Sequence, residues 1–387
     1  MNNQANTIIN LGDIPLVNNL KDSCQQAIDA SRYALRMVED KDMVFRLDLE
    51  IDPSLMFTDY LYRSSVNEPY KMHCRNMVED MQKFVDLSTI ENPTIIDVGG
   101  NDGTLLKEFR NKLPQFARFI NVDPSQSFVQ DNLECGIEYS QMFWADYQGK
   151  ERASVIVSTN VFQHNADVHG FLRSIRENLD GVWILEFPYF LRTAQTDQFD
   201  QIYHEHYYYW MITPLAKLFT QYGLSIISVS EHAIHGGTMR IISTNRGTGH
   251  CEAVQKYIDE ESLFDFKDWG MRVHSKIKGD EEIIRDLLKI GKVACFGAGA
   301  KSCVYLNCID QDLVKDIEYV VDDTLVKQGK FMPGTSLCVV DRNRLYEDQP
   351  DYLIILIHNF KDHIITSLRP HYKGKIIVMV PTVEKYN

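Results

Sequence analysis

Short apolar runs alternate with helical patterns through the middle of the chain, from residue 94 to about residue 245. The runs have the length of strands, and the intervals between them place apolar residues at the spacing of an amphipathic helix. This alternation predicts a doubly wound α/β sheet with a ligand at the carboxyl ends of its strands. The expected strands are residues 94–98, 118–122, 154–158, 182–187, 224–230 and 238–243.

The two ends of the chain are patterned differently. Residues 33–49 indicate a β-hairpin with a polar turn, and a helical stretch follows from about residue 68 to residue 87. Residues 251–290 are charged and helical in pattern, and residues 292–302 then begin a second strand, glycine turn and helix. Further strands are expected at residues 318–321, 352–357 and 375–380. We therefore expect a small N-terminal β-hairpin and helical domain (1–70), a Rossmann-like domain (71–250) and a second Rossmann-like domain (251–387).

The turn after the first strand of the sheet reads Gly99-Gly100-Asn101-Asp102-Gly103. Glycines allow positive φ and close approach of a ligand, and a helix N-terminus at this point presents free N–H groups. The dinucleotide pattern G-x-G-x-x-G is incomplete here, because its third glycine is missing. Asp97 lies before the turn, and Asp123 ends the next strand, where an acid suits a ribose diol. This arrangement favours S-adenosylmethionine over NAD, and an ordinary βα turn is the alternative.

A second chemical stretch is Tyr203-His204-Glu205-His206. It is not the H-E-x-x-H motif of a metalloprotease, so we expect no metal there. Successive ionisable and phenolic groups are costly to bury without a purpose, and they suit acid–base chemistry. A surface loop with aromatic anchors is the alternative. Downstream, His235-Gly236-Gly237 leads to Arg240, which could hold a phosphate or a hydroxyl, although a β-turn explains this pattern equally well.

The charge, the apolar runs and the cysteines of the chain exclude several classes of binding partner. The formal net charge of -14 argues against nucleic acid or an anionic membrane. No apolar run reaches the ~18 residues of a membrane span, and no secretory signal is visible at the N-terminus, so we expect a cytoplasmic protein. The eight cysteines form no C-x-x-C pair, which makes a cysteine zinc site unexpected.

Taken in order, the motifs of this chain are similar to those of the S-adenosylmethionine-dependent sugar C-methyltransferases. That family acts on nucleotide-linked ketosugars, and the C-3 methyltransferases of deoxysugar pathways are its best example. The likeness covers nearly the whole chain, and the motifs together are far more specific than any one of them. They are LGDIPLVNNL, MFTDYLYRSS, DVGGNDGTLL, TNVFQHNADVHGFL, LEFPY, YHEHYYYW, HGGTMR, FGAGAKS, KQGKFMPGT and the HNF at residues 358–360.

The resemblance implies three parts: an N-terminal zinc-binding domain, a methyltransferase domain, and a C-terminal Rossmann-like domain that helps to hold the sugar nucleotide. This chain departs from the family at its N-terminus, where the two cysteine pairs are missing. We therefore expect no zinc, and we expect the hairpin to be held by packing alone.

The resemblance also implies that a base removes the proton next to a ketone and that the enolate attacks the methyl sulfonium, with S-adenosylhomocysteine as the product. We expect His206 to be the base, with Glu205 orienting it or binding a sugar hydroxyl. The groups expected to position the substrate or to stabilise the enolate are Tyr203, Tyr62 and His164. The donor is expected to contact Asp97, Gly99, Asn101, Gly103, Asp123 and Asn160, with Phe143 or Trp144 against the adenine. The substrate is expected to contact His235, Gly236, Arg240, Lys301 and Asn359, with Lys301 and Arg240 at the diphosphate.

Two other functions fit the same residues. An O-methyltransferase would use the same donor site, with His206 removing a hydroxyl proton. A non-catalytic nucleotide-binding protein would use the second Rossmann-like unit, although GAGAKS lacks the full dinucleotide spacing for a separate NAD site. The expected state is a monomer or a homodimer.

Overall fold

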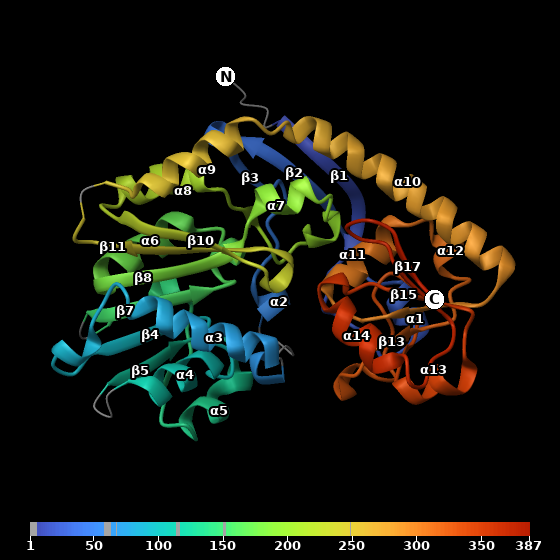
Figure 1. Ribbon diagram of the computed structural model, residues 1–387, viewed down its shortest axis with the longest axis horizontal. Coiled ribbons are helices and arrows are strands. Elements are labelled where there is room, and N and C mark those ends of the chain that lie inside the picture. The colour runs from blue at the N-terminus through green and yellow to red at the C-terminus, as the bar shows by residue number, and fades with distance from the viewer. Residues whose placement is uncertain (1–5, 58–62, 67, 114–116, 150–151, 248) are drawn as a thin grey trace.

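The computed structural model describes residues 6–57, 63–66, 68–113, 117–149, 152–247 and 249–387. Figure 1 shows two lobes side by side, joined along one edge by the first strands of the chain and by the long helix α10 (Phe266–Ile290). We call the lobe around the seven-stranded sheet the first lobe and the lobe around the six-stranded sheet the second lobe. In the described part of the chain, no helix is both long and apolar enough to cross a membrane.

The sheet of the first lobe has the order β10-β11-β8-β7-β4-β5-β6, and β11 runs antiparallel to both of its neighbours. Its strands are β4 (Thr94–Val98), β5 (Arg118–Val122), β6 (Glu138–Ser140), β7 (Ala153–Thr159), β8 (Leu179–Pro188), β10 (Ser225–His232) and β11 (Thr238–Thr244). The six predicted strands are confirmed, and β6 is an addition. The α/β fold class is therefore confirmed for this part of the chain.

Helices cover both faces of this sheet. They are α3 (Glu68–Met81), α4 (Thr104–Lys112), α5 (Val129–Leu133), α6 (Val168–Asn178), α7 (Phe190–Gln195) and α8 (Ile212–Gln221). Ile95 of β4 belongs to the same buried cluster as Met77 of α3 and Leu105 of α4, whereas Ile96 shares a cluster with Phe171 of α6. Because successive strand residues point to opposite faces, a strand covered on both sides is apolar along its whole length.

The N-terminal segment forms a four-stranded antiparallel sheet in the order β1-β2-β3-β9. Its strands are β1 (Asn6–Pro15), β2 (Arg32–Asp40), β3 (Val44–Leu47) and β9 (Tyr208–Tyr209), and the short helices α1 (Cys24–Ile28) and α2 (Ser54–Phe57) follow β1 and β3. The predicted hairpin is confirmed as β2 and β3. The edge strand β9 comes directly after the Tyr203–His206 stretch, so this sheet is hydrogen-bonded to the candidate acid–base segment.

The second lobe is a second Rossmann-like unit with the sheet order β14-β13-β12-β15-β16-β17, parallel except for β17. Its strands are β12 (Val293–Phe296), β13 (Val320–Val321), β14 (Val339–Val340), β15 (Tyr352–Ile355), β16 (Lys375–Val378) and β17 (Glu384–Tyr386). Its helices are α11 (Ala300–Cys308), α12 (Gln311–Val314), α13 (Arg342–Asp348) and α14 (Lys361–Leu368). The strands predicted here are confirmed, with β14 and β17 added.

Two helices connect the lobes, α9 (Glu252–Ser262) and α10. Glu261 of α9 is fully buried, and its carboxylate accepts hydrogen bonds from the backbone N–H groups of Ile212 and Thr213, at 2.6 and 2.8 Å, and from the hydroxyl of Tyr189 at 2.8 Å. A carboxylate at the start of α8 is favourable because free N–H groups gather at a helix N-terminus. This contact fixes the connecting helices to the first lobe. The predicted domain limits at residues 70 and 250 stay predictions.

Candidate active site

The glycine turn after β4 is tightly built. Gly99, Asn101 and Gly103 have positive φ values of 65°, 53° and 73°. A Cβ on Gly100 would lie only 2.7 Å from both Asn121 Oδ1 and Asp97 Oδ2, so no larger residue fits without displacement. The N–H of Gly100 donates to Asn121 Oδ1 at 3.0 Å, which ties the turn to β5. The turn thus keeps a fixed shape at the carboxyl end of the sheet, where an α/β fold binds its ligand.

Two buried carboxyl groups flank this turn, and they differ in their partners. Asp123 accepts the N–H groups of Asn101 and Ser125, at 3.0 and 2.9 Å. Asp97 is 1% exposed, and no described residue donates a hydrogen bond to its Oδ1. Burial raises the pKa of both groups, and for Asp97 the nearby Asp123 raises the pKa further. A buried acceptor without a protein donor suits a ligand that brings its own hydroxyl or ammonium group.

The segment before α3 covers the turn from outside. The N–H of Ser64 donates to Asn101 Oδ1 at 3.2 Å, and the N–H of Ser65 donates to Asp102 Oδ2 at 2.9 Å. Tyr62 lies outside the described residues, so its predicted role stays a prediction. Ser64 and Ser65, the last residues of the motif that contains it, are hydrogen-bonded to the glycine turn.

The two aromatic candidates for the adenine are separated by their burial. Trp144 is 3% exposed, its Nε1 donates to the Phe171 carbonyl at 3.2 Å, and its ring stacks on Tyr147. Phe143 is 46% exposed. Trp144 therefore belongs to the core and not to a ligand surface, which leaves Phe143 as the candidate.

The three side chains of the His204–His206 stretch each contact a different element. His204 Nε2 donates to the carbonyls of Tyr33 and Ala34 in β2, at 3.2 and 3.3 Å. Glu205 Oε1 accepts a hydrogen bond from Asn18 Nδ2 at 2.6 Å. The hydrogen-bond donor to the Glu205 carboxyl group is thus Asn18, and the expectation that Glu205 orients His206 or binds a sugar hydroxyl stays a prediction.

His206 lies against two other predicted site residues. Its Nε2 is 2.9 Å from the Tyr203 hydroxyl, and its ring centroid is 4.9 Å from that of His164. His164 Nδ1 donates to the backbone carbonyl of Glu205. Asn160, which has a positive φ of 54°, follows the last residue of β7 and leads to His164, and its N–H donates to the Glu186 carbonyl at 2.9 Å. The segment that follows β7 thus brings His164 against His206.

Burial sets the protonation states in this cluster. It lowers the pKa of His206 well below the ordinary value, with further lowering by the charges of His164 and Lys301. It also lowers the pKa of His164 to about 4 and raises the pKa of Glu205 to about 7. Both histidines are therefore neutral at pH 7, while Glu205 can gain or release a proton near that pH.

Residues from both lobes meet at what we call the lobe junction, formed by Asp200, Gly236, Lys301, His358 and Asn359. Gly236 lies in the 3-10 turn Ile234–Gly236, against the turn His358–Phe360 of the second lobe. A Cβ on Gly236 would lie 3.4 Å from Lys301 Nζ. His358 Nε2 is 3.4 Å from the buried carboxylate of Asp200. Three predicted substrate residues, Gly236, Lys301 and Asn359, are thus brought together; the side chain of His235 is not described.

The structure contradicts the prediction that Arg240 holds the diphosphate of the substrate. Its side chain is 1% exposed, its Nε donates to Glu186 Oε1 at 2.6 Å, and its Nη1 pairs with Asp80. His73 Nε2 lies 2.8 Å from the other oxygen of Glu186. The guanidinium is enclosed by a buried ion-pair network, so it is not placed to hold a diphosphate.

Three residues that the sequence interpretation did not select belong to the site: Asn18, Asn121 and Asp200. Asn121 is fully buried and supports the donor turn, and Asp200 faces the lobe junction. A polar residue inside a predicted buried strand is a signal that could have identified Asn121. Asn18 and Asp200 lie in turns, where the pattern of polar residues carries no such signal.

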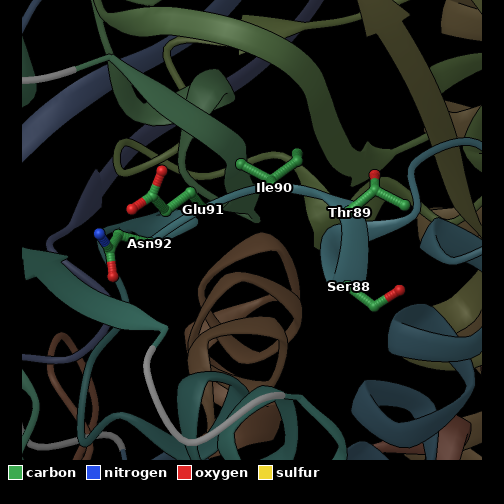
Figure 2. Close-up of a pocket in the computed structure, with 5 residues that line it drawn as sticks. All are labelled: Ser88, Thr89, Ile90, Glu91 and Asn92. Atoms are coloured by element: carbon green, nitrogen blue, oxygen red, sulfur yellow. The ribbon is translucent and has the colours of Figure 1, made fainter.

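A hollow of about 370 Å³ lies elsewhere on the first lobe (Figure 2). Its lining comes from one continuous segment, residues 88–92, which precedes β4. It is therefore at the amino end of that strand, away from the glycine turn. Among the described residues, no group of three or more His, Cys, Asp or Glu side chains could hold a metal ion.

Comparisons with known proteins agree with this geometry. Residues 72–229 match the family model described as a methyltransferase domain, and residues 233–381 match the C-methyltransferase C-terminal domain. The predicted enzyme class, an S-adenosylmethionine-dependent methyltransferase, is thereby confirmed. Within that class, the chain is similar to the C-methyltransferase NovU of Streptomyces niveus. The two are 26% identical over 397 residues, which cover 97% of this chain and 92% of NovU.

Solved structures resemble less than half of this chain. One is the magnesium protoporphyrin IX methyltransferase of Synechocystis PCC 6803, with 12% identity, 45% of this chain and 82% of that chain covered, and a TM-score of 0.37. Another is a putative S-adenosylmethionine-dependent methyltransferase from Listeria monocytogenes, with 14% identity, 46% and 100% coverage, and a TM-score of 0.36.

Proposed function

We propose that this protein transfers a methyl group from S-adenosylmethionine to a carbon next to the keto group of a nucleotide-linked sugar. The observation that carries the proposal is the cluster of His206, His164, Glu205 and Tyr203, in which His206 and Glu205 are buried and His206 contacts both Tyr203 and His164. Two neutral histidines beside a carboxyl group that titrates near pH 7 suit the removal of a weakly acidic proton. The similarity to a C-methyltransferase favours carbon over oxygen as the acceptor.

The donor would lie on the glycine turn. Asp123 would accept the ribose hydroxyls, Asp97 Oδ1, which has no described hydrogen-bond donor, would accept one from the ligand, and Phe143 would lie against the adenine. The remaining predicted contacts are Gly99, Asn101, Gly103 and Asn160. When bound, S-adenosylmethionine supplies an electrophilic methyl group on a sulfonium.

His206 would take the proton α to the carbonyl, because its imidazole is held neutral by burial. The resulting enolate needs hydrogen-bond donors aimed at its oxygen, and the Tyr203 hydroxyl and His164 are the described candidates. Tyr62 remains a candidate of the same kind. Glu205 would orient the substrate through a hydroxyl or pass the proton onward.

The substrate would enter at the lobe junction. Lys301 is half-buried there and close to Gly236, and Asn359 comes from the facing turn, so these groups and His235 would bind the diphosphate-linked end. A chain with a net charge of -14 needs such a local positive charge to attract an anionic substrate. We expect neither nucleic acid nor a membrane as a partner, and a monomer or a homodimer as the working state. Eight unpaired thiols are compatible with a reducing, cytoplasmic setting.

Proton exchange tests the proposal. The protein is incubated in deuterated water with nucleotide-linked 4-ketosugars and no methyl donor, and deuterium at the α carbon is followed by NMR. We expect exchange with the natural protein, none with His206→Asn, and unchanged exchange with His169→Asn, an exposed histidine bonded to Tyr222. Donor binding, measured by calorimetry, should survive in His206→Asn. Methyl transfer without any exchange would favour O-methylation, and donor binding without transfer to any candidate sugar would favour a non-catalytic protein.

A further inference from the structure

A hydrogen bond between residues far apart in the sequence ties the N-terminal segment to the acid–base cluster. Asn18 Nδ2 lies 2.6 Å from Glu205 Oε1, and the two residues are 187 positions apart. Glu205 is 5% exposed, whereas Asn18 is exposed. Among the described residues, this is the one hydrogen bond made to the Glu205 carboxyl group. A buried carboxyl with a single protein donor depends strongly on that donor for its orientation.

We propose that Asn18 is a positioning residue of the active site, and that it fixes the Glu205 carboxyl group in the orientation that the reaction requires. The proposal rests on the proposed function of the acid–base cluster. It makes the turn that follows β1 part of the active site.

The backbone around Asn18 is held on both sides, so its side chain has a defined starting point. Val17 is 2% exposed and belongs to the large core cluster. On the other side, Lys21 exchanges two backbone hydrogen bonds with Phe331 of the second lobe, at 3.0 and 2.7 Å. Asn18 therefore sits on a short bridge between the N-terminal sheet and the second lobe. A residue on such an anchored turn can hold a buried partner at small entropic cost.

The chemistry of asparagine suits this task. A lysine or arginine at this place would keep Glu205 ionised, whereas a neutral amide donates a hydrogen bond without a full charge. Burial raises the pKa of Glu205 to about 7, and the bond from Asn18 opposes that rise. Glu205 thus keeps access to both protonation states near neutral pH while its orientation is fixed.

The test compares Asn18→Ala and Asn18→Asp with Asn19→Ala, a change at the neighbouring exposed asparagine, for which the described residues show no hydrogen bond to Glu205. For each variant, the rates of α-proton exchange and methyl transfer are measured from pH 5.5 to pH 9, together with donor binding by calorimetry. We expect Asn18→Ala to lower kcat about 10- to 100-fold with donor affinity unchanged, because a displaced catalytic group loses its alignment. The pKa that governs the rate should move upward, since an interaction that favours the carboxylate is lost.

Asn18→Asp supplies a signature that a merely structural role would not give. A carboxyl at position 18 can donate to Glu205 only when it is protonated, and two neighbouring carboxylates repel each other. Its activity should therefore recover relative to Asn18→Ala as the pH falls. Rates and pH profiles equal to those of Asn19→Ala would overturn the proposal.

A readout without substrate separates this proposal from the proposed function. The unfolding free energies of the natural protein, Asn18→Ala, Glu205→Gln and the double variant are compared at pH 8. The two changes should be non-additive, because Asn18 acts on the Glu205 carboxyl. Non-additivity without activity on any ketosugar would contradict the proposed function and support the contact. Additive effects, or non-additivity with an unchanged rate, would overturn the positioning role.

Discussion

Replacing Glu205 with Gln should stabilise the folded protein at alkaline pH while it removes activity. The carboxyl group is 5% exposed, and burial raises its pKa from the ordinary value of 4.5 to about 7. In the unfolded chain the group ionises near pH 4.5, whereas in the folded protein it stays protonated until about pH 7. The contribution of Glu205 to the free energy of unfolding is thus fully present below the pKa of the unfolded chain. It is lost as the pH rises through the pKa of the folded protein. A difference of about 2.5 pKa units corresponds to about 3 kcal/mol.

The assay is urea unfolding at pH 5, 6.5 and 8, followed by the fluorescence of tryptophans such as the buried Trp210. Between pH 5 and pH 8, the natural protein should lose about 2.5 kcal/mol more stability than Glu205→Gln, because part of the difference is already present at pH 5. Urea midpoints that fall in parallel for the two proteins over this range would refute the reasoning.

Glu186→Gln is a matched control, because folding shifts the pKa of Glu186 in the opposite direction to that of Glu205. Burial alone would raise the pKa of Glu186, but the hydrogen bond from His73 and the charge of Arg240 outweigh it, so the pKa of Glu186 lies below its ordinary value. Its ionised form stabilises the fold above pH 4.5. The glutamine variant should therefore be destabilised at pH 8, because the buried guanidinium loses one of its charged partners.

Three further predictions follow from the site. Gly100→Ala should weaken donor binding at least about 10-fold in calorimetry, because its Cβ would lie 2.7 Å from two polar side chains of the turn; full affinity would contradict the tight turn. Arg240→Met should destabilise the protein by about 3–5 kcal/mol, because it leaves buried carboxylates unpaired, without raising KM for the sugar nucleotide; a raised KM with normal stability would restore its role at the diphosphate. Phe143→Ala should weaken donor binding about 10-fold by loss of a stacking partner, whereas Trp144→Phe should affect mainly stability.

The sequence predicted the strands of both Rossmann-like sheets because buried parallel strands are apolar along their length. β4, for example, is buried at all five positions, Thr94–Val98. The missed strands, β6, β14 and β17, have only two or three residues, which is too short for any periodicity to register. β9 is likewise two residues long, and its pairing with β3 depends on a tertiary contact that no local pattern encodes.

The candidate site was predictable where its chemical groups are consecutive in the sequence, as in the glycine turn and the His204–His206 stretch. Arg240 was misjudged because two glycines precede it, yet its strand position carried a better signal. In the sheet, Arg240 of β11 lies directly opposite Glu186 of β8, and both strands are expected to be buried. Opposite charges on two buried strands favour an ion pair over a phosphate site, because a buried charge needs a partner. Asn18 could not be found in this way, because its partner lies 187 residues away.

Burial is the shared cause of the displaced pKa values in the candidate site. For His206, His164, Glu205 and Lys301, burial is the largest contribution to the displaced pKa. Lys301 belongs to the second lobe, and its charge lowers the pKa of His206 in the first lobe further. An exposed histidine is already mostly neutral at pH 7, so the lowered pKa keeps His206 neutral over a wider range of lower pH. Through the charge of Lys301, the second lobe thus acts on the protonation state of a histidine in the first lobe.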